Sequence, residues 1–300
     1  MRALLDEPAA AWRRAPAPWR LAYAVGTALV LVGLAHGLVW LAVGGPWEGS
    51  VSFRKPYTFG VSFGLTTITL AWFADRLDLG HRVGWLLLVP LALANTSEVA
   101  WVAVQRARGV PAHFNFSTTL DRALYFIAGG GAIVVTSVVI AVLTVLAFTH
   151  RTDEPALTLA IRAGLLLLLV AVAVGVTMTV VGNARAVDGR TEDLVRWGAA
   201  GNMRVTHFLG LHGMQVLSAL AVWAAGLQGV VRRQVRLVAA ATVAWAALVL
   251  AGTMQWLDGR AVTQVRALDG ALVLVAVATL AVVVVLAARP PRGGAATMAG

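Results

Sequence analysis

The stretch Asn202-Met-Arg-Val-Thr-His-Phe-Leu-Gly-Leu-His-Gly-Met-Gln215 decides how this chain is interpreted, because it opens an apolar run long enough to cross a bilayer. Its first turns nevertheless carry four polar side chains: Arg204, His207, His212 and Gln215. Ionisable groups at membrane depth are expensive and are by default candidates for function. The stretch therefore predicts a transmembrane helix that carries part of a functional site.

The composition of the whole chain is typical of a membrane protein. Of its 300 residues, 59% are hydrophobic and 13% are charged, whereas a soluble domain is about 25% charged. The net charge of +10 fits basic residues that flank spans and face anionic lipid. No basic face with interleaved aromatic residues exists outside the apolar runs, so a nucleic-acid partner is not expected. The absence of cysteine excludes disulfides, thiolate metal ligands and iron–sulfur clusters.

Apolar runs of about 20 residues, the length that crosses a bilayer, set the predicted fold. There are eight: 21–43, 58–74, 83–104, 122–149, 156–182, 205–229, 236–257 and 268–288. Backbone groups in lipid must be satisfied within the segment, so the runs are helices. The predicted fold class is an all-α integral membrane protein, a bundle of about eight transmembrane helices. One transmembrane domain (21–288) follows a basic lead-in (1–20) and precedes a flexible C-terminal tail (289–300).

Location and partners follow from the same pattern. An even number of spans places both termini on one side, and the basic residues of the loops favour that side as the cytoplasm. The predicted location is therefore the cell (inner) membrane of a bacterium, with the lipid bilayer as the partner. A small-molecule or lipid-soluble substrate is compatible with this picture.

Three ionisable side chains on different predicted helices lie at one depth. At 1.5 Å per residue, His36, Glu98 and His212 all lie roughly 9–11 Å inside the same leaflet. Two imidazoles and a carboxylate suit a transition metal such as iron, zinc or copper. These three residues are the predicted metal ligands. A b-type haem between His36 and His212 is the neighbouring interpretation, with Gln215 orienting the His212 ring.

Further candidates lie nearer the surface on the same helix as His212 or in the loop at that end of the predicted bundle. His113 and His207 are predicted accessory ligands or proton shuttles, and Asn115 and Arg204 are predicted to position them; these four are the candidate catalytic residues. The structural alternative for Glu98 is a protonated carboxyl group, or an ion pair with Arg204 or Arg185.

Local patterns around the candidate loop also have structural interpretations. Thr118-x-x-Asp121 resembles a capping box that opens the fourth span. The neighbouring aromatic side chains predict a belt at the level of the lipid headgroups: Trp101, Phe114, Phe116 and Tyr125.

Glycine and proline mark close packing and candidate breaks in the spans. Gly33-x-x-x-Gly37 and Gly60-x-x-x-Gly64 are small-residue pairs that let helices approach closely. Pro90 and Gly129-Gly-Gly131 are the best candidates for broken helices, which often mark transporter sites.

Three classes of function remain open from the residues alone. The first is a membrane oxidoreductase with a metal or haem near one leaflet. The second is a proton- or cation-coupled transporter in which Glu98 and the histidines form a relay. The third is a non-catalytic membrane scaffold or assembly factor.

Overall fold

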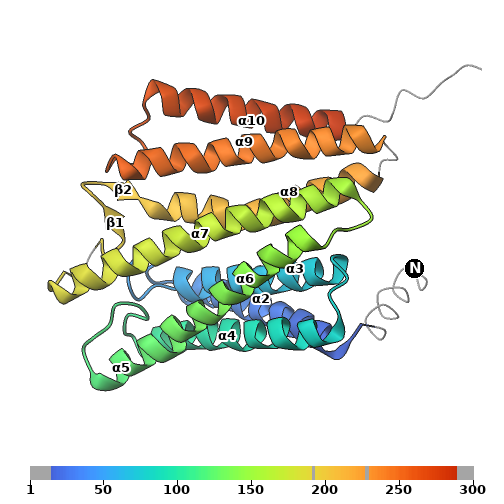
Figure 1. Ribbon diagram of the computed structural model, residues 1–300. Coiled ribbons are helices and arrows are strands. Elements are labelled where there is room, and N and C mark those ends of the chain that lie inside the picture. Colours follow the sequence, from blue (N-terminus) through green and yellow to red (C-terminus); the bar gives the residue numbers. More distant parts are fainter. Residues whose placement is uncertain (1–14, 191–192, 227–229, 289–300) are drawn as a thin grey trace, which may run out of the picture. The chain divides into compact units, whose positions relative to one another are not determined.

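The computed structural model describes residues 15–190, 193–226 and 230–288, and most of them are helical (Figure 1). Within these ranges, eight helical segments are long and apolar enough to cross a membrane. They are α2 (Ala17–Val43), α3 (Arg54–Arg76), α4 (His81–Ala107), the continuous segment Thr119–Thr149, α7 (Pro155–Val187), α8 (Met203–Gly226), α9 (Val231–Leu257) and α10 (Ala267–Ala288). Each predicted run is confirmed as a helix over its described residues, with ends shifted by a few residues. Residues 227–229, at the end of the sixth predicted run, lie outside the described residues. Residues 1–14 of the predicted lead-in and the predicted tail, 289–300, lie outside the described residues.

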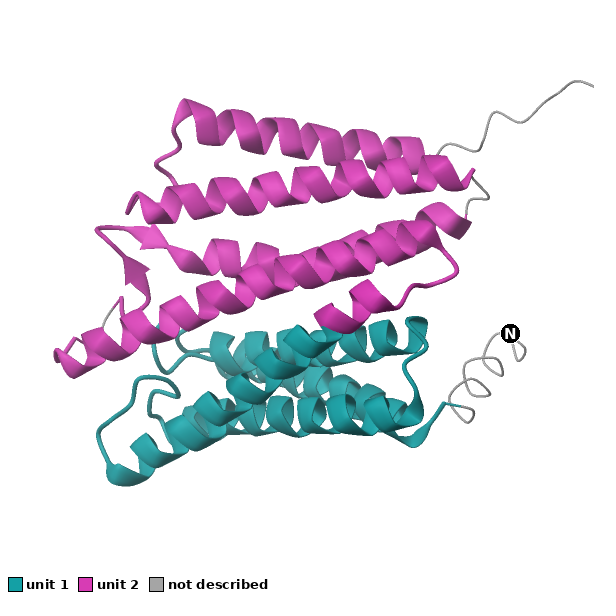
Figure 2. Ribbon diagram, viewed as in Figure 1, with its two compact units in different colours: residues 1–143 teal, residues 144–300 magenta. Residues whose placement is uncertain are grey.

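The chain divides into two compact units, and the division falls inside the fourth helical segment (Figure 2). Unit 1 comprises residues 1–143 and unit 2 comprises residues 144–300. Each unit is described by itself below.

In unit 1, glycine brings α2 and α3 into backbone contact. A Cβ atom added at Gly60 would lie 2.6 Å from the Cα of Gly33, and one at Gly64 would lie 2.5 Å from the carbonyl oxygen of Gly26. Only a residue without a side chain allows this approach, a kind of contact that is also common between the helices of membrane proteins. The predicted role of Gly33, Gly60 and Gly64 in close packing is confirmed, whereas Gly37 faces the ring of Tyr57.

The fourth segment changes its winding where three glycines follow one another. It consists of α5 (Thr119–Leu124), the π-helix η1 (Tyr125–Gly131) and α6 (Ala132–Thr149). Glycine has low helix propensity, so this stretch resists a departure from α-helical winding less than its neighbours do. The predicted break at Gly129–Gly131 takes the form of a π-helix. The predicted break at Pro90 is wrong, because α4 continues through it.

The start of the fourth segment has the predicted capping box. The backbone N–H of Asp121 donates to Oγ1 of Thr118 at 3.0 Å, and the Thr118 hydroxyl donates to Oδ2 of Asp121 at 2.8 Å. The Asp121 carboxylate also accepts from Gln105 (3.1 Å) and Arg108 (2.5 Å) on the end of α4. These contacts fix the loop between α4 and α5 at both ends.

Removing this cap should cost measurable stability. Thr118→Ala removes a hydroxyl that accepts one helix N–H and should lower the free energy of unfolding by about 1 kcal/mol. Thr118→Ser keeps the hydroxyl and should behave as the wild type. Denaturant titration of the detergent-purified chain, followed by tryptophan fluorescence, measures the difference. Equal stability of the alanine and serine variants would contradict the capping role.

In unit 2, α7 and α8 also pack through glycine. A Cβ atom added at Gly164 would lie 2.6 Å from the Cα of Met214.

A small hairpin covers the end of α9. It pairs β1 (Arg196–Trp197) with β2 (Gly201–Asn202). Its Trp197 meets Trp256 edge to face at 5.3 Å between ring centroids. Sequence patterns did not predict this hairpin, because strands of two residues show no alternation.

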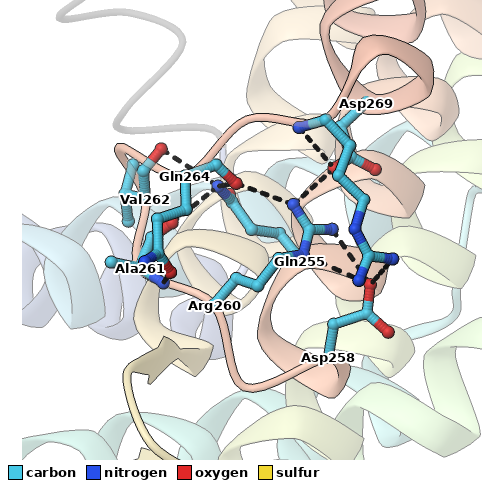
Figure 3. A network of polar contacts seen from close by, with 8 residues as sticks. Gln255, Asp258, Arg260, Ala261, Val262, Gln264 and Asp269 are labelled. Carbon is cyan, nitrogen blue, oxygen red and sulfur yellow. Dashed lines mark hydrogen bonds and ion pairs between the residues drawn. The ribbon is translucent and has the colours of Figure 1, made fainter.

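The connection between α9 and α10 is held by a network of charged and amide side chains (Figure 3). Arg260 forms ion pairs with Asp269 (2.7 Å) and Asp258 (3.1 Å), while the Gln255 amide donates to carbonyl oxygens of the loop. The carboxylate of Asp269, followed by that of Asp258, raises the pKa of Arg260 above its ordinary value. These contacts join the end of α9 to the start of α10, so the network fixes the turn.

Candidate functional site

Glu98 is the one acidic side chain of α4, and protein atoms enclose it completely. It lies nine residues before Ala107, the end of α4, which is about 14 Å along the helix axis. Its Oε1 lies 3.0 Å from Nε2 of His113. Its Oε2 is buried and has no hydrogen-bond partner among the described residues. Burying an ionised carboxylate is costly unless it is paired and fully hydrogen-bonded, so this half-satisfied group requires an explanation.

His113 reaches Glu98 because its loop folds back against α4. The indole N–H of Trp101 donates to the carbonyl oxygen of Ala112 at 3.0 Å, one residue before the histidine. One residue after it, Phe114 has a φ of 61°, a left-handed conformation that is uncommon for a bulky residue. Such backbone strain persists only where the surroundings fix it and is frequent at functional sites. The loop is thus held in a conformation that directs the imidazole inward.

Aromatic rings surround the imidazole on several sides. The ring centroid of His113 lies 5.3 Å from that of Phe59, 6.1 Å from that of Tyr125 and 6.2 Å from that of Phe114. We call these three residues the aromatic cage. The predicted lipid-headgroup belt is wrong for Trp101 and Tyr125, which are 5% and 4% exposed and pack inside the unit. These rings pack against the imidazole, whose side chain remains 19% exposed, whereas that of Glu98 is 1% exposed.

The second oxygen of Glu98 faces a glycine of the π-helix. A Cβ atom added at Gly129 would lie 3.4 Å from Oε2. Single-turn π-helical segments are rare and occur frequently at functional sites. The absence of a side chain at Gly129 leaves space beside the carboxyl oxygen that has no partner.

A buried amide one turn from Glu98 joins three helices. Asn95 donates from Nδ2 to the Thr67 hydroxyl on α3 at 2.7 Å and accepts at Oδ1 from the Thr136 hydroxyl on α6 at 2.8 Å. The Thr67 hydroxyl in turn donates to the carbonyl oxygen of Phe63. This satisfied network fixes the part of α4 that presents Glu98.

The other two predicted residues of unit 1, His36 and Asn115, form hydrogen bonds within their own segments. His36 donates from Nδ1 to the carbonyl oxygen of Val32, one turn earlier on α2, at 2.8 Å. Asn115 is 6% exposed and accepts at Oδ1 from the Ser117 hydroxyl at 2.7 Å. Its Nδ2 is buried without a partner in the described part of the chain. Of the predicted set, unit 1 therefore brings Glu98 and His113 together. The alternative ion pair of Glu98 with Arg204 or Arg185, which belong to unit 2, stays a prediction.

The predicted residues of unit 2 lie on α8. His207 donates from Nδ1 to the carbonyl oxygen of Ala171 on α7 at 2.7 Å. The His212 ring packs on Phe208, with centroids 4.3 Å apart. In the amide orientation that satisfies both of its atoms, Gln215 donates to the carbonyl oxygens of Leu211 (2.9 Å) and His212 (3.3 Å).

Arg204 lies at the start of α8 with an exposed side chain, and its backbone N–H donates to Oδ1 of Asn202 at 3.1 Å. Arg185, on α7, donates to the carbonyl oxygen of Asp193 at 2.8 Å. The predicted positioning role of Arg204 is not tested by these contacts and stays a prediction.

The predicted metal and haem ligands do not come together within either unit. Across residues 15–190, 193–226 and 230–288, no group of three or more His, Asp or Glu side chains is placed to hold a metal ion. His36 and Glu98 belong to unit 1 and His212 belongs to unit 2. The joint metal site, and the haem between His36 and His212, therefore stay predictions.

Sequence reasoning named Glu98 and His113 but missed their environment. The missed residues are Phe59 in the aromatic cage and the bridging Asn95. A signal for the buried face of α4 was present, because Asn95, Glu98 and Gln105 recur at spacings of three and seven. Residues so spaced share one face of a helix, and all three side chains are fully buried.

Comparisons with known proteins add no family to this picture. No protein-family model matches the chain, and searches of curated proteins and of solved structures returned no match.

Proposed function

We propose that this chain is an integral multi-pass membrane protein that acts as a proton-coupled transporter, with Glu98 and His113 binding the coupling proton. The observation that carries the proposal is the buried carboxylate with one oxygen on an imidazole and the other without a partner. Intramembrane ionisable groups commonly mark substrate or proton pathways. The bilayer is proposed to be the cell (inner) membrane, with both termini cytoplasmic.

The outer surfaces of the helices support placement in lipid. Leu38 and Leu41 on α2 are 66% and 71% exposed, and Leu274 on α10 is 73% exposed. Monomeric soluble proteins rarely expose apolar patches beyond a few hundred Å². A hydrocarbon environment removes the cost of such exposure.

The charge balance of the pair supports proton binding. With one dissociable proton shared between Oε1 of Glu98 and Nε2 of His113, the pair is neutral overall. Loss of that proton leaves a buried negative charge, and gain of another leaves a positive charge. Both are expensive in a low-dielectric interior, so a conformational change that admits water or a counter-charge would release or bind the proton.

Reconstitution tests the proposal directly. The full chain is placed in proteoliposomes that contain a pH-sensitive dye, a pH gradient is imposed, and small organic and inorganic solutes are added one at a time. We expect at least one solute to accelerate dissipation of the gradient relative to protein-free liposomes. If no solute moves protons at any orientation of the gradient, the transporter proposal is wrong.

The space at Gly129 makes a sharper prediction. Gly129→Ala places a methyl group against Oε2 of Glu98, so it should slow solute-coupled proton movement several-fold while the helix still forms. Gly130→Ala is the matched control, because its Cβ would meet only the carbonyl oxygen of Tyr125 at 3.9 Å. The comparison is made in the same liposome assay. Equal slowing in both variants would show that the π-helix matters, rather than the space beside Glu98.

A second candidate function, a metal- or haem-dependent membrane oxidoreductase, has one specific observation in its favour. The carbonyl oxygens that His36 and His207 contact can only accept, so the proton of each neutral ring is on Nδ1. Metal-binding histidines usually donate their other N–H in this way, which leaves Nε2 with its lone pair. In this version His36 keeps its predicted role as a ligand, and His207 keeps its predicted role as an accessory ligand.

An absorption spectrum and elemental analysis of the purified protein separate the candidates. A Soret band or a stoichiometric transition metal that is lost in His207→Ala would favour the oxidoreductase. If neither cofactor nor solute-coupled proton movement is found, the scaffold or assembly factor becomes the better interpretation.

A further inference from the structure

The second oxygen of Glu98 borders a position with room for one further atom. A heavy atom at the Cβ position of residue 129, a glycine, would lie 3.4 Å from Oε2 and 3.9 Å from Cδ2 of Tyr125. Apart from the backbone of the same helix and the two flanking residues, no other described atom would lie within 4 Å of it. Because Oε2 is buried without a donor in the described part of the chain, this position suits a small group that carries N–H bonds.

The surroundings of this position favour a positive charge. The described ion pair of Glu98 is with His113 and uses the other oxygen, Oε1. The attraction between a carboxylate and a cation is stronger in the interior of a protein than in water. The ring of Tyr125 lies beside the position, and aromatic rings attract ammonium groups. A cationic nitrogen donor is therefore the partner that suits the buried oxygen.

We propose that the position between Oε2 of Glu98 and Gly129 binds a primary ammonium group. The nitrogen of such a group is one heavy atom with three N–H donors, so it matches both the size of the position and the oxygen beside it. A quaternary ammonium group is larger and has no N–H to donate. The wider assignment rests on the proposed transport function: the transported solute is a small primary amine in its cationic form.

Charge balance couples binding of the amine to release of a proton. The pair of carboxylate and imidazolium is neutral, and the ammonium group brings one further positive charge. The imidazolium then loses its Nδ1 proton to water and keeps the Nε2–H that donates to Oε1. The site is neutral again, and both carboxyl oxygens have a donor. The imidazole is the more exposed member of the pair, at 19% against 1% for Glu98, so it is the group that gives its proton to water.

The pair and one phenol are the titratable groups that the described contacts place at this position. Tyr125, from η1, lies edge to face against the His113 ring. The contacts from the other helices are made by Phe59 of α3 and by the two hydroxyl groups bound to Asn95, none of which titrates near neutral pH. Since a proton and the ammonium group compete for one carboxylate, lowering the pH should weaken amine binding. Tyr125→Phe should keep this dependence.

Binding is measured on the full chain in uncharged detergent, with the probes compared at equal ionic strength. The probes are the chlorides of methylammonium, tetramethylammonium and sodium. The readout is the thermal unfolding midpoint, which rises with any ligand that binds the folded state. Methylammonium should stabilise the chain at a concentration about tenfold or more below the other two, because it alone has N–H donors for Oε2. Equal stabilisation by tetramethylammonium or by sodium overturns the ammonium assignment.

A second measurement follows the proton. In weak buffer with a pH indicator, methylammonium should release about one proton for each ion bound. Its affinity should also fall as the pH is lowered. Binding without proton release, or with an affinity independent of pH, overturns the exchange.

Variants locate the bound ion. Gly129→Ala should weaken methylammonium binding about tenfold or more, because its methyl group fills the position at an ordinary contact distance from Oε2. Gly130→Ala is the matched control in the same π-helix and should bind as the wild type does. Glu98→Gln should abolish binding, and melting without any probe checks that each variant folds. Unchanged affinity in Gly129→Ala, or equal weakening in Gly130→Ala, overturns the proposed position.

The amine site and the proposed transport function fail in different experiments. Methylammonium binding that depends on Gly129, without proton movement across proteoliposomes, would refute transport and keep the site. Proton movement that is driven by an anionic or neutral solute and is unchanged by methylammonium would refute the amine assignment and keep transport.

Discussion

Glu98→Gln is expected to reduce solute-coupled proton movement about 100-fold or more, the scale associated with loss of a proton-transferring side chain. The amide keeps the volume of the carboxyl group and can still contact Nε2 of His113 through its oxygen. It cannot take up or release a proton near neutral pH. The helices should remain folded, since the substitution keeps the side-chain volume and leaves the Asn95 network intact. The measurement is the rate of gradient dissipation in proteoliposomes.

The control for this variant is a carboxylate that the site does not use. Glu154 lies in the exposed turn before α7, so Glu154→Gln should keep the wild-type rate. His113→Gln should have an intermediate effect, because the carboxyl group remains while its proton partner is lost. Wild-type rates in Glu98→Gln would remove Glu98 from the proton pathway and leave the oxidoreductase and scaffold alternatives.

The helices were predictable because a single physical requirement sets their length. A segment that crosses lipid needs about 20 apolar residues and must satisfy its own backbone, so composition alone places each run. The capping box at Thr118 was equally accessible, because its hydrogen bonds are local. The hairpin at Arg196–Asn202 was not accessible, since it depends on packing against Trp256.

The site was predicted in its residues and only partly in its geometry. Depth along a helix was used to place Glu98 beside His36 and His212, two residues of other predicted spans. His113 instead enters from a loop that is held by Trp101 and the Asp121 contacts. Such long-range hydrogen bonds leave no period in the sequence. The polar face shared by Asn95, Glu98 and Gln105 was the available clue that α4 faces protein.

Gly64→Leu is expected to have the largest effect on the fold of unit 1. A Cβ atom at Gly64 would lie 2.5 Å from the carbonyl oxygen of Gly26 and 2.7 Å from the backbone nitrogen of Val30. Backbone cannot yield as a flexible side chain can, so α2 and α3 must separate. Overpacking of this kind costs typically 1–3 kcal/mol and occasionally more. We expect the free energy of unfolding to fall by about 3 kcal/mol or more, as measured by denaturant titration in mild detergent.

A graded series distinguishes close packing from a general effect of losing glycine. Gly64→Ala and Gly60→Ala should both destabilise, because even one carbon would lie within 2.6 Å of backbone atoms. Gly80→Ala should be neutral, since nothing lies within 4 Å of its Cβ position and its φ of −58° suits alanine. Because the glycines of α2 and α3 meet backbone atoms of the other helix, the loss of unfolding free energy should follow the volume of the new side chain and not its hydrophobicity. If Gly64→Ser were as stable as wild type while Gly64→Ala were not, polarity and not volume would govern this contact, and the glycine interface would need a different explanation.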